Sequence, residues 1–361
     1  MVQEKYDALK YRKWVHLNQL SSINKDNKFS IMTFNLLSRH YIWRDVYEQN
    51  NPDDLDWTKH RFPLINQTIR QFNCDIMCFQ EMEYYVYKRH WSKNFPNENF
   101  KSFYMQKSSP EYNSNENTDG VAIFINTERF DVIEEHRINY GEEILKHEKN
   151  YDLTNDLLKR VIPRNTVGII LKLHDKRFNK ILYVTNTHLY WSPEYNDVKI
   201  IQTKLLLNKL NSCRKEMDSS VLFLGDLNSN FNSDVIKLIQ ERKLDISKSK
   251  EFLNHEYGIN NALINSDGII ENPIKLRNVY QELFENSKLH FTTCVTKFAD
   301  VVDHIFITDD IKVNKILGEV DPDYMDTNDI GFPNEQFPSD HIPLVAEIGY
   351  KSVDNINGFA E

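Results

Sequence analysis

The sequence predicts an α/β fold in which two mixed sheets pack face to face with helices on their outer sides, a four-layered sandwich. Apolar runs of strand length recur along the chain, and stretches with helical periodicity lie between them. Several runs are almost continuously apolar, which is typical of strands covered on both faces. Because strand–helix–strand alternation occurs in both halves of the chain, we expect two packed sheets with helices outside.

The clearest apolar runs predict the central strands of this fold. They are bounded by polar or Gly-, Pro- and Asn-rich segments, as strands usually are. In chain order they are residues 29–37 (FSIMTFNLL), 74–81 (CDIMCFQE), 120–126 (GVAIFIN), 166–173 (TVGIILKL), 181–189 (ILYVTNTHL), 221–228 (VLFLGDLN) and 301–308 (VVDHIFIT).

Helices and loops are expected between these strands. Residues 60–73 and 197–215 have helical periodicity. The second of these helices is expected to carry one apolar stripe and to begin at Asp197 as its N-cap. Residues 107–118 predict an exposed loop, and residues 141–160 predict a loop that is helical in part.

The chain is expected to hold one catalytic domain, over residues 29–349. No Pro/Gly/Ser-rich linker and no repeat of 20–50 residues divides the sequence. An N-terminal extension (residues 1–28) is expected to pack on the domain, and residues 350–361 are expected to form a C-terminal tail.

The composition is that of a globular protein, with 361 residues of which 40% are apolar and 27% charged. The formal charge is 44 − 53 = −9, which argues against coating of duplex DNA by an overall basic surface. A local basic groove is still compatible with this charge, and Arg164 and Lys199 are candidate cations for it.

Cysteine usage and the lack of long apolar segments predict an intracellular protein. Four cysteines are too few and too scattered for a disulfide framework, and Cys74 and Cys78 are expected to be buried free thiols. The apolar stretches are far shorter than the ~20 residues that a membrane helix needs, and the N-terminus has no signal-peptide core. Among intracellular compartments the cytoplasm is favoured, with the mitochondrion and the nucleus as alternatives.

Polar side chains interrupt the apolar strands near their ends, where sites usually lie in α/β folds. Because they come from different strands or strand edges, we expect them to converge on one cleft. They are Asn35, Glu81, His188, Asp226, Asn228, Asp303 with His304, and Asp340 with His341.

Three of these residues suit a metal ion. Glu81, Asn35 and Asp340 offer hard oxygen ligands, which Mg²⁺, or Mn²⁺ in its place, prefers. The chain has no HExxH motif, no paired CxxC and no thiolate cluster. A metal here is therefore expected to be bound by oxygen.

The remaining residues suit metal-assisted hydrolysis of a phosphate ester by in-line attack. Asp226 and Asn228 are two positions apart, so in an extended segment they share a face. There one orients or deprotonates water, and the other donates its amide to a phosphoryl oxygen. His188 and His341 are expected to hydrogen-bond the phosphate, and Asp303 to fix the tautomer of an imidazole.

Structural roles compete with these interpretations. Asp226 can cap a turn, and Ser339 and Asp340 can begin a helix or a turn. Asp303 and His304 point to opposite sides of a strand, so at most one of them faces the cleft, and we expect Asp303 there. Taken together, the structural interpretations require several independent coincidences.

Six motifs, in this order, resemble the endonuclease/exonuclease/phosphatase superfamily: FNLL, FQEM, NTHLYW, GDLNS, VVDHIF and PSDHIPL. Residues 119–132 (DGVAIFINTERFDV) and 191–203 (WSPEYNDVKIIQT) resemble its carbon-catabolite-repressor deadenylase branch, which includes Nocturnin, Angel and the yeast Ngl-type RNA exonucleases. The chain is most similar to the Ngl type. The resemblance implies a DNase I-like four-layered sandwich and Mg²⁺-dependent cleavage of phosphodiesters at RNA 3′ ends, often poly(A).

The resemblance also implies roles for individual residues. The catalytic set is Glu81, His188, Asp226, Asn228, Asp303 and His341, and the metal set is Glu81, Asn35 and Asp340. Pro193 and Phe298 fall where deadenylases of this branch sandwich an adenine, and Arg164 resembles a substrate-side arginine. With Asn228 these three form the expected substrate-binding set.

The leading hypothesis is a Mg²⁺-dependent 3′-to-5′ exoribonuclease that acts on single-stranded RNA 3′ ends and favours poly(A). The alternatives are a Nocturnin-like phosphatase for a nucleotide cofactor or other small phosphate ester, and an inactive RNA-binding scaffold. The scaffold is disfavoured because Glu81, Asp226 and His341 are all retained. A further family Asn has two competing counterparts, Asn165 and Thr166. The leucine-rich repeats that dock the repressor deadenylase in its large complex have no counterpart in this sequence, so a stand-alone monomer is expected.

Overall fold

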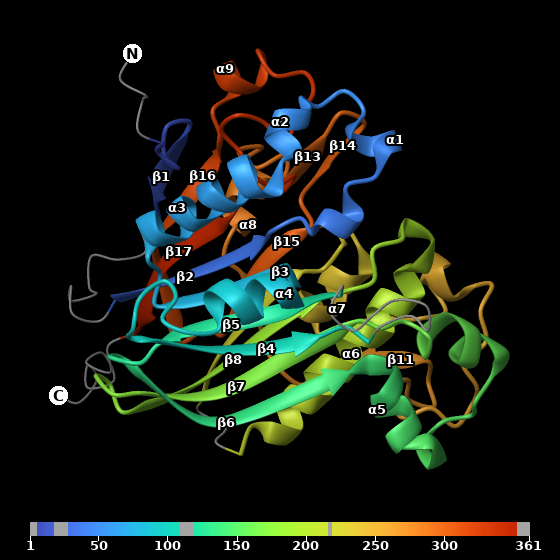
Figure 1. Ribbon diagram of the computed structural model, residues 1–361. Coiled ribbons are helices and arrows are strands. Elements are labelled where there is room, and N and C mark those ends of the chain that lie inside the picture. Colours follow the sequence, from blue (N-terminus) through green and yellow to red (C-terminus); the bar gives the residue numbers. More distant parts are fainter. Residues whose placement is uncertain (1–5, 18–27, 109–117, 216–218, 352–361) are drawn as a thin grey trace, which may run out of the picture.

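Two large sheets pack against each other in the computed structural model, and helices cover their outer sides (Figure 1). The structure describes residues 6–17, 28–108, 118–215 and 219–351. The predicted four-layered α/β sandwich is confirmed. Within these ranges, no helix has both the length and the apolar composition needed to cross a bilayer.

The first sheet has seven strands, with β2 and β3 as a parallel pair and the other neighbours antiparallel. In spatial order they are β1 (Arg12–His16), β16 (Ile311–Val320), β17 (Leu344–Tyr350), β2 (Lys28–Asn35), β3 (Ile76–Glu83), β5 (Asp119–Asn126) and β4 (Phe100–Gln106). Part of the expected N-terminal extension, residues 12–16, is thus an edge strand of this sheet.

The second sheet has six strands, with β8 and β9 as its parallel pair. In spatial order they are β12 (Arg277–Asn278), β15 (Asp303–Ile307), β9 (Ser220–Asp226), β8 (Lys180–His188), β7 (Val167–Asp175) and β6 (Phe130–Asn139). Two short ribbons pair β10 (Lys243–Asp245) with β11 (Ile269–Glu271), and β13 (Thr293–Val295) with β14 (Phe298–Asp300). All seven predicted strands are confirmed as members of the two large sheets.

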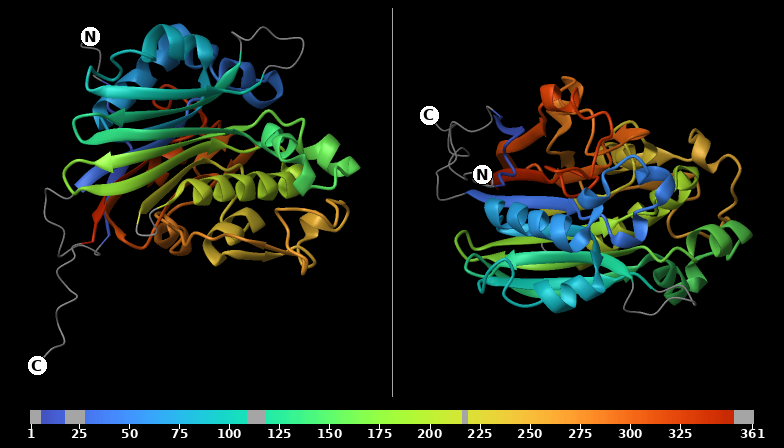
Figure 2. Two further views of the ribbon diagram at one scale, coloured as in Figure 1. Left: turned by 90° about the horizontal axis from the view of Figure 1, so that it is seen from below. Right: turned by 45° about the horizontal axis from the view of Figure 1, so that its top comes forward.

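The helices lie on the outer sides of the two sheets. They are α1 (Arg44–Tyr47), α2 (Pro52–Leu55), α3 (Phe62–Phe72), α4 (Tyr84–Val86), α5 (Tyr140–Lys146), α6 (Asn196–Cys213), α7 (Asp234–Glu241), α8 (Gln281–Glu285) and α9 (Pro322–Met325). In the left view of Figure 2 the blue helices around α3 cover one outer side, and the yellow-green α6 covers the other.

Alternation along β2 and β3 explains why their sequences are almost continuously apolar. Ile31 and Ile76 belong to the core between the sheets, whereas Met32 and Met77 pack with Ile65 of α3 on the outer side. Because both faces of these strands are buried, every position favours an apolar side chain. Polar residues are therefore left to the strand ends.

α6 is buried around most of its circumference, so the predicted single apolar stripe is wrong. Even its Lys199 and Lys204 are buried. The ammonium of Lys199 donates to the carbonyl oxygen of Asn228 at 2.8 Å, and that of Lys204 donates to the carbonyl oxygen of Glu271. α7 packs against α6, which makes this helix a core element rather than a surface one.

The predicted N-cap of α6 is also wrong. Tyr195 precedes the helix, and Asp197 lies in its first turn. Asp197 instead forms a buried ion pair with Arg160, at 2.8 Å. A carboxylate in the first turn still interacts favourably with the helix dipole.

The predicted loops differ in how they fit the structure. Residues 109–117 of the loop expected at 107–118 lie outside the described residues, but Lys107 is buried rather than exposed. α5 and short helical turns occupy much of residues 141–160, as expected for a loop that is helical in part.

The cysteine prediction is confirmed, because Cys74 and Cys78 are buried free thiols. Both termini extend beyond what can be compared with the sequence predictions. Residues 1–5 and 18–27 of the expected extension, and residues 352–361 of the expected tail, lie outside the described residues.

Candidate active site

One end of the six-stranded sheet brings three of the predicted residues into a single row. His188 lies beside Asp226 in the parallel pair β8–β9, and Asp226 lies beside Asp303 in the antiparallel pair β9–β15. Residues in register on adjacent strands point to the same face, and all three side chains are buried. Gly225 permits this close pairing, because a Cβ there would meet the carbonyl oxygen of Thr187 at 2.1 Å.

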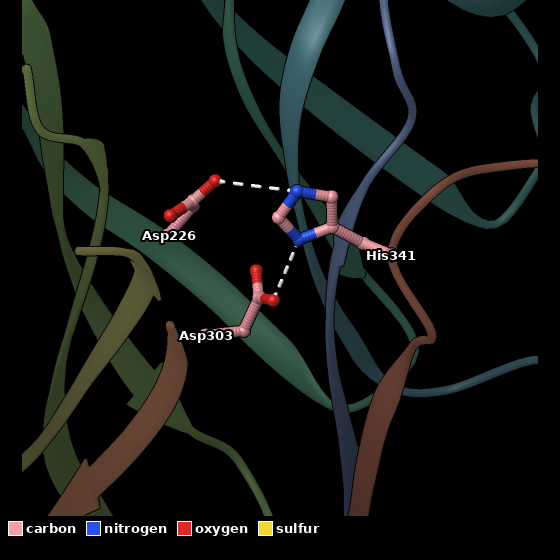
Figure 3. Close-up of side chains that lie close together, drawn as sticks. All are labelled: Asp226, Asp303 and His341. Carbon is pink, nitrogen blue, oxygen red and sulfur yellow. Dashed lines mark hydrogen bonds and ion pairs between the residues drawn. The ribbon is translucent and has the colours of Figure 1, made fainter. Parts of the chain in front are cut away.

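His341 joins this row from the loop before β17. Its Nδ1 lies 2.7 Å from Oδ2 of Asp303, and its Nε2 lies 3.8 Å from Oδ2 of Asp226 (Figure 3). Burial lowers the pKa of His341, but the nearby carboxylate charges, above all that of Asp303, outweigh it and hold this pKa well above the usual imidazole value. The geometry is that of an imidazole oriented by one carboxylate and facing a second.

The same three side chains have a spacing that also suits a cation. One ligand atom from each of Asp226, Asp303 and His341 lies within 4.8 Å of the others. Because Asp303 already accepts the Nδ1 hydrogen of His341, only Nε2 of that ring remains for a further contact. The arrangement is therefore better described as a hydrogen-bonded dyad beside a carboxylate.

The two oxygens of Asp226 have different partners. Oδ1 accepts the backbone N–H of Asn228 at 2.9 Å and so caps the turn after β9, while Oδ2 accepts the amide of Asn35 at 2.9 Å. The turn-capping role and the cleft-facing role therefore coexist in one residue. Burial and the charge of Asp303 raise the pKa of Asp226 to about 6, which makes it a stronger base than an exposed Asp.

Asn228 does not have the predicted geometry. β9 ends at Asp226, and Asn228 has a φ of 47°, so the two residues do not share a face of one extended segment. The reason is the cap itself, which bends the chain directly after the strand. The side-chain amide of Asn228 donates to the carbonyl oxygen of Leu189 at 3.0 Å.

The seven-stranded sheet supplies Glu81 to the same end of the molecule. Glu81 lies at a bulge where the register of β3 and β5 shifts, and its φ is 55°. A bulge re-aims the side chain away from the regular alternation of the strand. Oε1 of Glu81 accepts the amide of Asn35 at 2.9 Å, and Oε2 accepts the N–H of Ser38 at 2.7 Å.

Asn35 connects the two sheets at this point. Its Nδ2 donates to both Glu81 and Asp226, and its Oδ1 accepts the N–H of Leu37 at 3.0 Å. In this arrangement the amide nitrogen faces the carboxylates and holds them at a fixed separation. The metal-ligand role of Asn35 stays a prediction.

Asp340 approaches Glu81 from the loop that also carries His341. Its Oδ2 accepts the hydroxyl of Tyr47 at 2.8 Å. Ser339 donates to the carbonyl oxygen of Asn35 at 2.7 Å, so this segment is a tethered turn and no helix begins there. Burial and the charges of Asp340 and Asp119 raise the pKa of Glu81 to about 8, which shows that carboxylates are crowded here without compensating positive charge.

A cleft of about 700 Å³ opens over these side chains. The predicted site residues that line it are Glu81, His188, Pro193, Asp226, Asn228, Phe298, Asp340 and His341, together with Asn165 and Thr166. Asn35 and Asp303 are not among the lining residues and act through the side chains that they contact. Arg164 is not among them either, since its guanidinium lies over the rings of Tyr190 and Tyr195.

Lys199, the second candidate groove cation, lines the cleft but has little free charge to offer. Its ammonium is bound by the carbonyl oxygen of Asn228, and burial lowers its pKa to about 8. The role that the structure supports is to hold the turn after β9 in place.

A buried ion pair beside the cleft has no counterpart among the sequence predictions. Nζ of Lys107 lies 2.8 Å from Oδ2 of Asp119 and 3.5 Å from Nδ1 of His188. Burial and the charge of Lys107 lower the pKa of His188 well below its usual value, so the ring is neutral. With the ammonium directed at Nδ1, the ring hydrogen is on Nε2. The available signal was Asp119, a carboxylate at the end of a predicted strand like the others.

Comparison with known proteins adds the family context. Residues 32–341 match the model of the Endonuclease/Exonuclease/phosphatase family. The CCR4-Not complex 3′-5′-exoribonuclease subunit Ccr4 of Saccharomyces cerevisiae is 30% identical over 96% of this chain and 41% of the yeast protein. The probable Ccr4 subunit of Enterocytozoon bieneusi is 30% identical over 90% of this chain and 64% of that protein. The chain spans about two fifths of the length of the first of these curated relatives.

Solved structures with the same fold include two from phosphate-ester chemistry. ANGEL2, a 2′,3′-cyclic phosphatase in complex with adenosine-2′,3′-vanadate, superposes with a TM-score of 0.76 at 23% identity over 94% of this chain and 98% of its own. The human Nocturnin catalytic domain with bound sulfate gives a TM-score of 0.63 at 19% identity over 97% of this chain and 100% of its own.

Proposed function

The chain belongs to the Endonuclease/Exonuclease/phosphatase family, and on this premise we propose that it is a Mg²⁺-dependent 3′-to-5′ exoribonuclease that favours adenine-rich RNA ends. The motif resemblance to the family is confirmed. The observation that carries the proposal is the convergence of His188, Asp226 and His341 with Glu81 in one cleft, although they come from two different sheets. The relatives named as Ccr4 exoribonucleases support the reaction class.

The residues present fit a hard divalent cation. Glu81 and Asp340 offer carboxylate oxygens, and the raised pKa of Glu81, to about 8, reflects burial and repulsion from Asp340 that a cation would relieve. We assign Glu81 and Asp340 as the metal-holding residues, with Asn35 beside them. A bound Mg²⁺ would supply Lewis-acid polarisation of a phosphoryl oxygen.

The other side chains have roles that follow from their protonation. Asp226, with its pKa raised to about 6 by burial and Asp303, is still mostly ionised at pH 7 and accepts the proton of the attacking water. His341, oriented by Asp303, directs its Nε2 hydrogen at the phosphate. His188 donates from Nε2, because Lys107 lies at its Nδ1.

The base preference is proposed from two further residues. Pro193 and Phe298 line the same cleft, and Phe298 is 52% exposed, so its ring is accessible to a base. Stacking on such groups tolerates any base. The preference for adenine therefore rests on the resemblance to deadenylases, and it is the part of the proposal that the assay must test directly.

The test is degradation of 5′-labelled single-stranded RNA that ends in a poly(A) or a poly(U) tail, with Mg²⁺ and with EDTA. We expect stepwise shortening from the 3′ end, faster on poly(A), and no shortening with EDTA. Equal rates on both tails would remove the adenine preference, and activity in EDTA would remove the metal.

Release of phosphate from a dinucleotide cofactor, measured with the same enzyme sample, separates the phosphatase alternative. If phosphate release is faster than RNA trimming, the protein is a small-molecule phosphatase. Absence of both activities, with intact RNA binding, would leave the scaffold alternative.

A further inference from the structure

Five aromatic side chains form a series across the mouth of the cleft. In order, the ring centroids are 6.0 Å apart for Tyr41–Trp43, 5.6 Å for Trp43–Trp191, 6.1 Å for Trp191–Tyr190 and 5.1 Å for Tyr190–Tyr195. We call these five residues the aromatic track. The first two follow β2 of the seven-stranded sheet and the other three follow β8 of the six-stranded sheet, so the track joins loops of both sheets.

The track has features of a binding surface rather than of a core. Trp43 is 45% exposed and Trp191 is 55% exposed, although indole rings are usually well buried. Both line the cleft, as do Tyr41 and Tyr190, while Tyr195 lies beyond its lining. The track therefore begins at the catalytic residues and continues away from them. None of its members has a role in the hydrolysis derived above.

Positive charge accompanies the track at both ends. At the inner end, Nζ of Lys107 lies 5.4 Å from the ring centroid of Tyr41. At the outer end, the guanidinium of Arg164 lies 4.8 Å from the ring centroids of both Tyr190 and Tyr195.

Arg164 is held in place without losing its charge. Its nitrogens donate to the carbonyl oxygens of Arg160 and Lys159. Across residues 6–17, 28–108, 118–215 and 219–351, no carboxylate lies within ion-pair distance of it. Its charge therefore remains available to an anion.

We propose that the aromatic track binds the nucleotides on the 5′ side of the scissile phosphate in a single-stranded RNA, with bases on Trp43 and Trp191 and a backbone phosphate at Arg164. This inference rests on the proposed exoribonuclease function and adds the length and strandedness of its substrate. Alternating aromatic rings and cations are how proteins bind single strands without reading sequence. A paired base offers no free face, so the track selects unpaired 3′ ends longer than a dinucleotide.

The experiment compares kcat/KM for a dinucleotide and for an eight-nucleotide oligoadenylate. We expect the wild-type protein to prefer the longer substrate. Trp43→Ala and Trp191→Ala each lower kcat/KM for the longer substrate by roughly 5- to 100-fold, through KM, because that is the range for loss of one base stack. The dinucleotide rate stays unchanged, and Trp191→Phe restores most of the preference.

Tyr85→Ala is the matched control, because Tyr85 is 44% exposed and is not among the residues that line the cleft. It should leave both rates unchanged. Equal losses on both substrates in the tryptophan variants would indicate a role in the fold or the chemistry and would overturn the inference. An unchanged preference for the longer substrate would overturn it as well.

Failure of the proposed function can be recognised separately. If the wild-type protein cleaves no RNA, binding still decides whether the track exists. Fluorescence anisotropy of a labelled eight-nucleotide oligoadenylate is measured with the Asp226→Asn variant, in which cleavage is blocked. Binding that becomes at least fivefold weaker when Trp191→Ala is added supports the track, and equal binding of the two proteins rejects it.

Discussion

The two sheets contribute unlike halves to the cleft. On the six-stranded side, His188, Asp226 and Asp303 stand in register, and His341 is hydrogen-bonded to Asp303. On the seven-stranded side, Glu81 lies on a bulge with a φ of 55° and is crowded by other carboxylates. One half is satisfied by its own hydrogen bonds, and the other has an excess of negative charge.

This difference indicates how the site divides its work. The six-stranded half is preorganised for handling protons, because each of its side chains already has a partner that sets its orientation. The seven-stranded half resembles a cation site, where strain and like charges are tolerated because a metal offsets them. The three predictions below test this division.

The largest effect is expected on the six-stranded side. Asp226→Asn removes the base but keeps the size of the side chain, so kcat should fall by about 10²- to 10⁴-fold. Single-turnover assays on a 3′-adenylated RNA measure it. Asp245→Asn is the control, because Asp245 is a strand-end carboxylate outside the cleft lining and should be dispensable. A loss of less than tenfold in Asp226→Asn would place the base elsewhere.

A second effect concerns stability on the face of β15 opposite to Asp303. Nδ1 of His304 accepts the amide of Asn278 at 3.0 Å, and its Nε2 donates to the carbonyl oxygen of Ser229 at 2.7 Å. Burial lowers the pKa of His304 to about 4. The unfolded chain takes up this proton near pH 6.5, so the stabilising contribution is complete above pH 6.5 and is lost as the pH falls toward 4.

The expected loss is about 3 kcal/mol by pH 4, from roughly 2.5 pKa units. Urea unfolding between pH 7 and pH 4.5 measures it, with His304→Gln as the variant that should lose this part of the slope. His341 has the opposite sign: its pKa is raised, mainly by Asp303 against the effect of burial, so its contribution is present below pH 6.5 and is lost only as the pH rises through the folded value. Identical slopes in wild type and His304→Gln would contradict the assignment.

The smallest effect is expected on the seven-stranded side, as a shift of several degrees in Tm. Mg²⁺ should raise the Tm of the wild-type protein, because it binds the folded state. Glu81→Gln should raise the Tm in EDTA by removing repulsion, and it should abolish the response to Mg²⁺. Differential scanning calorimetry at pH 8.5 compares the two.

Glu83→Gln is the control for this metal response. Glu83 is two positions from Glu81, but it pairs with Arg39. That variant should keep the wild-type shift with Mg²⁺. An unchanged Mg²⁺ response in Glu81→Gln would show that the cation binds elsewhere.

Much of the fold and of the site was predictable because it is encoded locally. The seven apolar runs became central strands, and polar residues such as Glu81 and Asp226 interrupt them where the core ends. Local pattern failed where neighbours decide. α6 is covered on its far side by α7, and the turn after Asp226 bends Asn228 out of the strand. Periodicity contains no information about either neighbour.

The sequence by itself determined the fold class, the family and the chemical types that face the cleft, because periodicity and ordered motifs are properties of the chain. Only the tertiary structure decided which of these groups meet. The bridge from Asn35 to Asp226 spans the two sheets, the Lys107–Asp119 pair lies beside His188, and the aromatic track joins loops that are far apart in the chain. Such contacts depend on register and on sheet packing, which distant segments set together.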